Sequence, residues 1–321
     1  MVTSAGERTV DGALSVDVAV IGAGPAGLSA ALNLVRARRT VLLVDANRPR
    51  NAATLRSHGF VTRDGVSPLE LRRLGRTEVE GYPEATVVQS VVDRVARDGD
   101  GWSVHGSWRG TELRARARAV VVATGLREEF PALPSLRAFY GTSVHSCVEC
   151  DGYEHGGAAL AFLCETPDVV DRALLVASWT DDLVVYTNGA ATLDDAGRAR
   201  LAAAGVVVDE RPLADLEGDR HGLTGVRLAD GDVRPHTGAF VRPLWHADLD
   251  RVEAPLDRDA EGLVRVDRLG RTGVPGLYAV GDVTPPGPEQ LIVAAGHGAS
   301  TAAAVHRDLV GGLEDLRDAV Q

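Results

Sequence analysis

Two cysteines and an aspartate stand close together in the segment Cys147-Val148-Glu149-Cys150-Asp151. Cysteines at this spacing can close a small disulfide across one turn. Thiol-disulfide exchange needs a thiolate that attacks and an acid that protonates the leaving sulfur. Asp151 is a candidate for that acid/base role, and Glu149 is expected to raise the pKa values of the thiols. The segment therefore predicts redox chemistry.

Two other interpretations of these cysteines stay open. The pattern Cys147-x2-Cys150-x4-His155 resembles part of a zinc knuckle, although Cys164, the remaining candidate ligand, comes late and at the expected end of a strand. The cysteines can also be structural thiols. Three cysteines are too few for the disulfide framework of a secreted domain. We predict a redox pair and no metal site.

A glycine-rich segment, Gly22-Ala23-Gly24-Pro25-Ala26-Gly27, follows the β-branched run 16–21 and precedes an Ala/Leu-rich helical stretch that reaches residue 36. A second apolar run, 41–44, ends at Asp45, which completes a βαβ unit. Such glycines let backbone N–H groups approach a pyrophosphate at the helix N-terminus, and Asp45 can accept from a ribose hydroxyl. A dinucleotide is predicted here, but this motif alone does not separate FAD from NAD.

A second candidate for cofactor binding lies near the C-terminus. Gly281 and Asp282 close a short buried strand and precede a helix that is expected to begin near Gln290. The carboxylate can bond a ribityl hydroxyl, and the positive end of the helix dipole suits the pyrimidine edge of a reduced flavin. Together with the first motif, this pattern favours FAD.

The remaining segments alternate between strand and helix patterns. We expect a helix at 68–80, a strand at 87–95 and a β-meander at 102–123, in which Arg114, Arg116 and Arg118 share one strand face. A solvated face is favoured over a basic binding patch. A strand at 158–163, a helix at 168–178 and a strand at 183–186 repeat the βαβ order, so the predicted fold class is α/β.

The composition limits the choice of partners. The chain has 321 residues, of which 45% are hydrophobic and 25% charged, and its formal net charge is −11. This charge repels phosphate backbones and anionic lipids, so we expect neither a nucleic-acid nor a membrane partner. The first fifteen residues lack an apolar signal region, and no stretch approaches the ~20 apolar residues of a membrane span. A cytoplasmic location is expected.

The order and approximate spacing of five motifs resemble the low-molecular-weight thioredoxin reductases over nearly the whole chain. These motifs are Gly22 to Gly27, Ala123-Thr124-Gly125, Cys147 to Asp151, Gly281-Asp282-Val283 and Gln290-x5-Gly296. The resemblance implies two Rossmann-like, three-layer ββα domains. It implies an FAD domain split between residues 1–127 and 247–321, an inserted NAD(P)H-domain-like unit at 128–246 that carries the cysteines, and a homodimer.

The same resemblance implies a role for each matching residue. Cys150 corresponds to the sulfur nearest the flavin C4a, Cys147 to the sulfur that exchanges with substrate, and Asp151 to the acid/base. Four histidines are candidates to assist proton transfer, with surface or packing roles equally plausible: His58, His145, His155 and His297. The FAD contacts outside the first βαβ unit are expected at Asn51, His58, Ala123, Thr124, Gly125, Gly281, Asp282, Gln290 and Leu291.

The second βαβ unit departs from the reductases. Where they have a glycine-rich phosphate loop, this chain has Cys164-Glu165-Thr166-Pro167, and no glycine lies between Gly157 and Gly189. Side chains take the space of a pyrophosphate, Glu165 adds a like charge, and Pro167 lacks a backbone donor. By the same resemblance, the family's basic pair for the 2′-phosphate falls on Thr187-Asn188-Gly189, which offers no cation. We therefore expect that NADPH is an unlikely cofactor.

Two branches of the family resemble such a chain: the FAD-dependent dithiol oxidases of the holomycin and gliotoxin type, and the NADPH-independent flavin thioredoxin reductases. Segments 179–182 and 186–189, with Arg50-Asn51 and His58-Gly59, resemble the oxidases more, whereas Val148-Glu149 replaces their proline and aromatic residue between the cysteines. We expect an FAD-dependent dithiol:disulfide oxidoreductase that oxidises a small dithiol with O2. The alternatives are a reductase of a disulfide or small redox protein, fed by ferredoxin or NADPH, and a flavin redox sensor that does not turn over.

Overall fold

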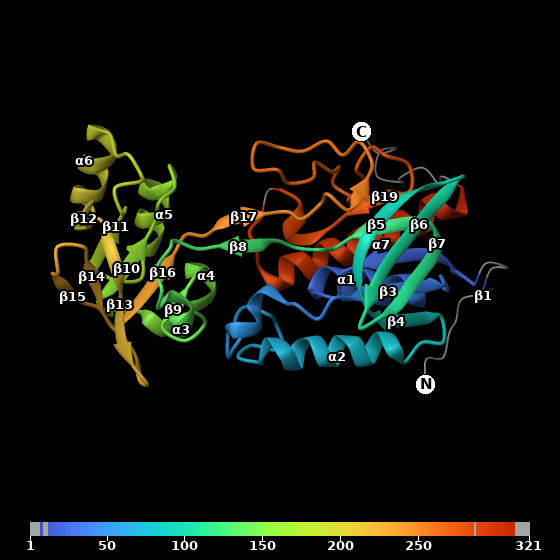
Figure 1. Cartoon of the computed structure of the whole chain (residues 1–321), viewed down its shortest axis with the longest axis horizontal. Coiled ribbons are helices and arrows are strands. Elements are labelled where there is room, and N and C mark those ends of the chain that lie inside the picture. The colour runs from blue at the N-terminus through green and yellow to red at the C-terminus, as the bar shows by residue number, and fades with distance from the viewer. Residues whose placement is uncertain (1–6, 9–11, 286, 312–321) are drawn as a thin grey trace. The chain divides into compact units, whose positions relative to one another are not determined.

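The computed structural model describes residues 7–8, 12–285 and 287–311, and the chain divides into two compact units (Figure 1). The first comprises residues 1–50, 59–127 and 246–321, and the second comprises 51–58 and 128–245. Residues 51–58, which the expected boundaries place with the FAD domain, thus group with the second unit. The connecting segments β8 (Arg127–Glu129) and β17 (Leu244–His246) pair with each other as a two-stranded sheet.

The first unit is built on a nine-stranded mixed sheet. In its central part β4, β3, β2, β7 and β19 run parallel in that order, and the long strand β7 also pairs antiparallel with β6 of the meander. The strands are β1 (Glu7–Arg8), β2 (Leu14–Ile21), β3 (Val41–Asp45), β4 (Ala85–Gln89), β5 (Val91–Asp98), β6 (Gly101–Trp108), β7 (Thr111–Val122), β18 (Val252–Glu253) and β19 (Leu277–Ala279).

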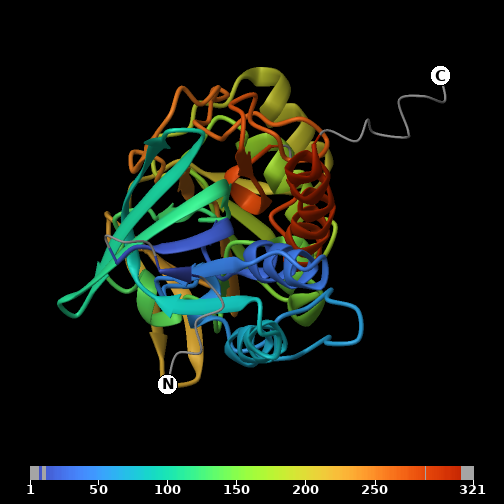
Figure 2. The same ribbon diagram turned by 90° about the vertical axis from the view of Figure 1, so that its right-hand side faces the viewer.

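Apolar side chains cover both faces of this sheet. Helices α1 (Pro25–Arg36) and α7 (Leu291–Val310) lie side by side on one face (Figure 2), where Leu34 and Val305 pack against alternate residues of β2 and β7. The other face carries Trp102 and residues between 249 and 283. The remaining helical segments are η1 (Arg50–Ala53), α2 (Pro68–Glu80) and η3 (Gly281–Val283). The result is a three-layer Rossmann-like unit.

Most of the elements expected in the first unit are confirmed. The βαβ unit lies at β2, α1 and β3, and α2 spans the predicted 68–80, where Ser67 caps the helix by accepting from the Glu70 amide. The prediction of a single strand at 87–95 is wrong. The chain changes partner at Ser90, so β4 pairs with β3 and β5 pairs with β6. The residues on both sides of Gln89 and Ser90 fit a strand pattern, and that pattern does not show where the chain changes partner.

The arginine face on β7 is a solvated one, as expected. The strand alternates between buried alanines and outward-facing arginines along its first half. Each arginine forms an ion pair with a carboxylate: Arg114 with Glu112, Arg116 with Asp98 and Arg118 with Asp17. The charge of each of these three arginines is therefore compensated by a carboxylate of the protein itself.

The second unit repeats the parallel arrangement on a smaller scale. Its five-stranded sheet has the order β12-β11-β10-β16-β9, and an antiparallel sheet of β13, β14 and β15 forms a separate layer. Helices α5 and α6 cover the opposite face. The elements are α3 (Leu136–Phe139), β9 (Val144–His145), α4 (Val148–Asp151), η2 (Tyr153–His155), β10 (Leu160–Leu163), α5 (Val169–Val176), β11 (Leu183–Tyr186), α6 (Asp195–Ala203), β12 (Val207–Asp209), β13 (Leu213–Asp219), β14 (Gly222–Leu228), β15 (Val233–Pro235) and β16 (Gly238–Val241).

The predicted fold class is confirmed, because both units place helices on a parallel sheet in the manner of a Rossmann fold. Within the described ranges, no helix combines the length and the hydropathy that crossing a membrane requires.

One carboxylate ties the end of α7 to the sheet of the first unit. Asp308 accepts hydrogen bonds from Arg271 Nε at 2.8 Å and Nη2 at 2.9 Å, and the Tyr278 hydroxyl of β19 donates to it as well. Burial raises the pKa of Asp308, but the hydrogen bonds from Arg271 and Tyr278 outweigh burial and hold the pKa below its ordinary value.

Asp308→Asn is expected to lower the free energy of unfolding by about 1–2 kcal/mol at pH 7, because charge-assisted hydrogen bonds are lost from a partly exposed group. A carboxyl group whose pKa is lowered in the folded state stabilises the fold at pH values above its unfolded pKa of about 3.9. This stabilisation is lost as the pH falls through the lowered pKa. In urea unfolding of FAD-saturated protein, the free energies of unfolding of the wild type and Asp308→Asn should therefore converge as the pH approaches about 3. Asp98→Asn, which breaks only an exposed ion pair, is the control. Equal losses in both variants would contradict this account.

Candidate redox and cofactor sites

Cys147 and Cys150 are joined by a disulfide in the second unit, with their Cα atoms 5.2 Å apart. Cys147 is the N-cap of α4, and its carbonyl oxygen accepts from the amides of Cys150 and Asp151 at 3.2 and 3.1 Å. This turn brings the two sulfurs within bonding distance. The predicted disulfide is confirmed, and Asp151 directly follows it at the end of α4.

Two histidines lie beside this turn. The Nδ1 atom of His145 is 3.4 Å from Asp151 Oδ1, and the ring of His155 lies 5.0 Å from that of His145 between centroids. Burial lowers the pKa of His155, and the neighbouring His145 lowers it further. His155 is therefore neutral near pH 7. The structure thus groups a disulfide, a carboxylate and two imidazoles on α4, η2 and β9.

The other two candidate histidines belong to different units. His58 Nε2 is 3.5 Å from Glu154 Oε1 in the second unit, and residues 51–58, which include Asn51, belong to that unit. His297 lies in the first unit, where its Nδ1 accepts from the Gly281 amide at 3.2 Å and burial lowers its pKa. The FAD contacts expected at Asn51 and His58 stay predictions.

The other candidate cofactor residues gather at one edge of the first unit, beyond the carboxyl ends of β2, β3, β7 and β19. Gln290 is the N-cap of α7, and Leu291 is its first residue. The residues at the strand ends are Gly22, Gly24, Pro25, Ala26 and Gly27 after β2, Asp45 at the end of β3, Ala123, Thr124 and Gly125 after β7, and Gly281 and Asp282 after β19. Ligands of α/β proteins bind at this edge of the sheet.

The three glycines of the first motif differ in what surrounds them. A Cβ atom on Gly22 would lie 2.3 Å from the Ala123 oxygen, and one on Gly27 would lie 1.9 Å from the Gly22 oxygen. A Cβ atom on Gly24 would meet no protein atom within 4 Å. Helix α1 begins just after Gly24, with no acidic residue in its first turn and no capping side chain from the described part of the chain. Its first amides therefore suit a pyrophosphate, and the residues fit FAD.

Two arginines bind the acidic residues of this edge, and no motif of the sequence predicts either contact. Arg72 Nη2 donates to both oxygens of the buried Asp45, and Arg50 Nη2 donates to Asp282 Oδ2 at 2.8 Å. Burial raises the pKa of Asp282, while Arg50 opposes that rise. Arg72 lies 27 positions from Asp45, and Arg50 lies 232 positions from Asp282. No spacing rule connects residues that are so far apart in the chain.

The corresponding edge of the second unit is occupied by side chains. After β10, Glu165 Oε1 accepts from Asn188 Nδ2 at 2.7 Å, and Asn188 Oδ1 accepts from the Leu213 amide at 2.7 Å. Asn188 follows β11 and has a positive φ of 53°. These contacts join the loops after β10 and β11 to the start of β13.

A carboxylate of the protein itself lies at the start of α5, although it accepts no hydrogen bond from the amides of this helix. Asp168 is the N-cap residue, and its carboxylate accepts from Thr166 Oγ1, from Arg172 Nε at 3.1 Å and from Arg242 Nε at 3.1 Å. Burial raises the pKa of Asp168, but the hydrogen bond from Thr166 and the charge of Arg242 outweigh it, and the pKa is lowered. A pyrophosphate at this position would face an ionised carboxylate.

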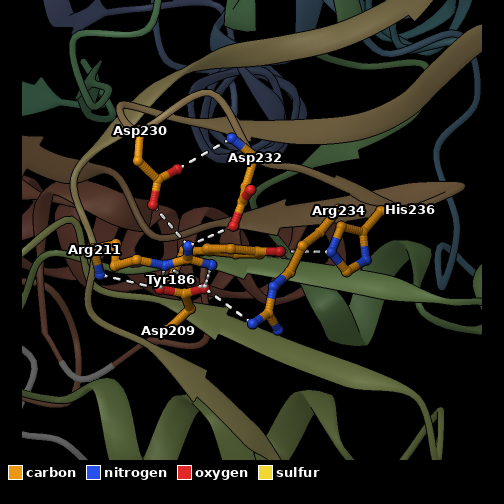
Figure 3. A network of polar contacts seen from close by, with 7 residues as sticks. All are labelled: Tyr186, Asp209, Arg211, Asp230, Asp232, Arg234 and His236. Atoms are coloured by element: carbon orange, nitrogen blue, oxygen red, sulfur yellow. Dashed lines mark hydrogen bonds and ion pairs between the residues drawn. The ribbon is translucent and has the colours of Figure 1, made fainter.

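A polar network lies at the ends of β11 and β12 (Figure 3). The nearly buried Asp209 accepts from Arg211 Nη2 at 2.8 Å and pairs with Arg234 at 3.3 Å. Arg211 also reaches Asp230 and Asp232, so three carboxylates face two guanidinium groups. Beside them the Tyr186 hydroxyl lies 2.8 Å from His236 Nε2, and burial raises the pKa of Tyr186 to about 12. Both arginines are already neutralised.

The third cysteine remains a free thiol. Cys164 follows β10, is fully buried, and its sulfur lies 3.3 Å from Thr166 Oγ1. Burial raises the pKa of this thiol, although the hydrogen bonds with Thr166 oppose the rise. Within the described ranges, no cluster of three or more histidine, cysteine or acidic side chains is arranged to hold a metal ion.

A dinucleotide cradle on one Rossmann-like unit and a disulfide on the other define a flavin-dependent oxidoreductase that acts on disulfides. The chain belongs to the pyridine nucleotide-disulphide oxidoreductase family, whose match covers residues 16–208, more than half of the chain. Membership in this family implies that the protein binds FAD.

Similar proteins agree with this assignment. A probable thioredoxin reductase of Arthroderma benhamiae is 27% identical, over 91% of this chain and 80% of its own length. The crystal structure of a putative thioredoxin reductase from Bacillus anthracis is 34% identical, with a TM-score of 0.84, over 92% of this chain and 98% of its own. The crystal structure of HlmI is 38% identical, with a TM-score of 0.87, over 98% and 97% of the two chains.

Gly24→Val should abolish FAD binding without unfolding the protein. The backbone at Gly24 is extended, with φ −77° and ψ −178°, which valine adopts readily, and no protein atom would touch the new Cβ. The side chain would instead stand where the pyrophosphate approaches α1. We expect flavin absorbance of the purified protein to fall at least about tenfold, with an unchanged circular dichroism spectrum. Gly27→Val, which meets backbone at 1.9 Å, should fail to fold. A yellow Gly24→Val protein would count against the assigned cradle.

Proposed function

We propose that the protein is an FAD-dependent dithiol oxidase, which closes a disulfide in a small dithiol and uses dioxygen as the electron acceptor. Its redox group is the Cys147–Cys150 disulfide, with Asp151 as the acid/base. The cofactor residues of the first unit would hold FAD, and the assembly would be a homodimer, which the resemblance to thioredoxin reductases supports.

One observation carries the choice of an oxidase over an NADPH-fed reductase: the nucleotide edge of the second unit is filled by its own side chains. Glu165 and Asn188 bond to each other across the two loops, and Asp168 places a carboxylate at the start of α5, where it would repel a pyrophosphate. Arg211 and Arg234, the nearby cations, are engaged by carboxylates. Electrons must therefore come from another donor, and a dithiol substrate supplies them.

The reaction at the disulfide balances as two exchanges. A substrate thiolate attacks Cys147 Sγ, the bond between the two cysteine sulfurs breaks, and Cys150 leaves as a thiolate that takes a proton from Asp151. The second substrate sulfur then attacks the first, releases Cys147 and closes the substrate disulfide. The cysteines gain the electron pair that the substrate loses. Bound FAD would accept this pair and pass it to dioxygen, which yields hydrogen peroxide.

An anaerobic titration of the yellow protein tests this proposal. One equivalent of dithiothreitol should bleach the flavin, and air should restore the colour with about one equivalent of peroxide. NADPH at the same concentration should leave the spectrum unchanged. Bleaching by NADPH would overturn the account of the second unit. Bleaching by neither reagent would favour a ferredoxin-fed reductase or a redox sensor instead.

Cys150→Ser should retain FAD but lose dithiol-dependent oxygen consumption by roughly 10³-fold or more, because no disulfide is left for the substrate thiolate to attack. Cys147→Ser should lose it as well, since the sulfur that exchanges with substrate is gone. Cys164→Ser is the matched control and should keep its activity, because this thiol is buried and unpaired with either redox sulfur. Turnover by the Cys150 variant would refute the role assigned to that residue.

A further inference from the structure

The turn that carries Asp282 is held by two helices of the first unit. Gly281 and Asp282 begin η3, and the Gly281 amide donates to His297 Nδ1 on α7 at 3.2 Å. A Cβ atom on Gly281 would lie 2.8 Å from the Cβ atom of Ala26 on α1, so the turn also packs closely against that helix. The backbone at Asp282 therefore has little freedom to move.

Arg50 holds one of the two oxygens of the Asp282 carboxylate. Its Nη2 atom donates to Asp282 Oδ2 at 2.8 Å and lies 3.5 Å from the carbonyl oxygen of Glu289, just before α7. Within the described ranges, no group donates a hydrogen bond to Asp282 Oδ1, and 18% of the Asp282 side chain is exposed. The carboxylate is thus fixed through one oxygen and stays within reach of a ligand.

The groups around Asp282 act on its charge in opposite directions. Burial raises the pKa of Asp282, the charge and hydrogen bond of Arg50 lower it, and the nearby Glu289 raises it. On α7, burial lowers the pKa of His297, so this ring adds no positive charge at neutral pH, and α1 contributes the apolar Ala26. Among these neighbours, Arg50 is the group that favours the ionised carboxylate.

We propose that Arg50 is a positioning residue of the FAD site, which keeps Asp282 a hydrogen-bond acceptor for a hydroxyl group of the FAD ribityl chain. The proposal rests on the FAD contact assigned to Asp282. Arg50 takes Oδ2 and leaves Oδ1 for the ligand, and a hydrogen bond to an ionised oxygen is roughly twice as strong as a neutral one. Without the guanidinium group, the carboxyl group has to lose a proton before it binds FAD in this way. Each pH unit below its pKa then weakens binding by up to about tenfold.

Release of FAD on dilution of the yellow holoprotein tests this role without any turnover. The fluorescence of the freed flavin gives the dissociation constant of FAD, which is measured from pH 5 to 9. We expect Arg50→Met to raise this constant about 10–100-fold at pH 6. At pH 9 the increase should be less than about threefold, because Asp282 is ionised there without help. The pH at which binding weakens should lie at least about one unit higher than in the wild type.

Three further variants separate this role from a simple loss of packing. Arg50→Lys keeps a cation and a donor, and it should restore the wild-type dissociation constants to within about threefold. Arg48→Met removes an exposed arginine from the same segment and should bind FAD as the wild type does. Asp282→Asn cannot titrate, so its weaker binding should not vary with pH, and adding Arg50→Met to it should introduce no pH dependence.

An equal loss of FAD affinity at every pH in Arg50→Met would overturn the proposal, and so would a wild-type pH profile in this variant. Asp282→Asn with wild-type affinity throughout would refute the contact between Asp282 and FAD, and with it the role of Arg50. None of these results bears on the oxidase reaction, because the dissociation of FAD involves no dithiol and no electron transfer. The anaerobic titration decides that reaction separately.

Discussion

The first amides of a helix attract negative charge, and the two units differ in the charge that the chain itself places there. In the first unit, α1 starts after Gly24 with no acidic residue in its first turn, which suits the pyrophosphate of a dinucleotide. In the second unit, Asp168 places a carboxylate at the N-cap of α5, where Arg172 and Arg242 hold it, although it accepts no hydrogen bond from the amides of the helix. The same βαβ topology thus has no acidic residue at the helix start in one unit and a carboxylate there in the other.

The loops after β10 and β11 of the second unit bond to each other and to β13. The edge strand of the same sheet, β9, presents His145 to the turn of α4. A rigid strand and a four-residue helix therefore set the distance between an imidazole and a carboxylate, which flexible loops would leave variable.

The elements of the fold could be predicted from the sequence because they depend on local pattern. The glycine spacing after a β-branched run predicted the first βαβ unit, and the spacing of the cysteines predicted the disulfide. The change of partner at Ser90 could not be predicted, since the residues on both sides of it fit a single strand pattern. The contacts of Arg72 with Asp45 and of His145 with Asp151 could not be predicted either. Such contacts between different elements depend on how strands and helices pack and not on a spacing in the chain.

The burial of Cys164 matters for an enzyme that would generate hydrogen peroxide in its own interior. Peroxide oxidises thiolates far faster than thiols, and it must first reach the sulfur. Cys164 is inaccessible to solvent, and its raised pKa keeps it protonated. If the proposed oxidase reaction takes place, this sulfur would therefore be spared from sulfenic acid formation over many catalytic cycles, and the peroxide would leave without damaging it.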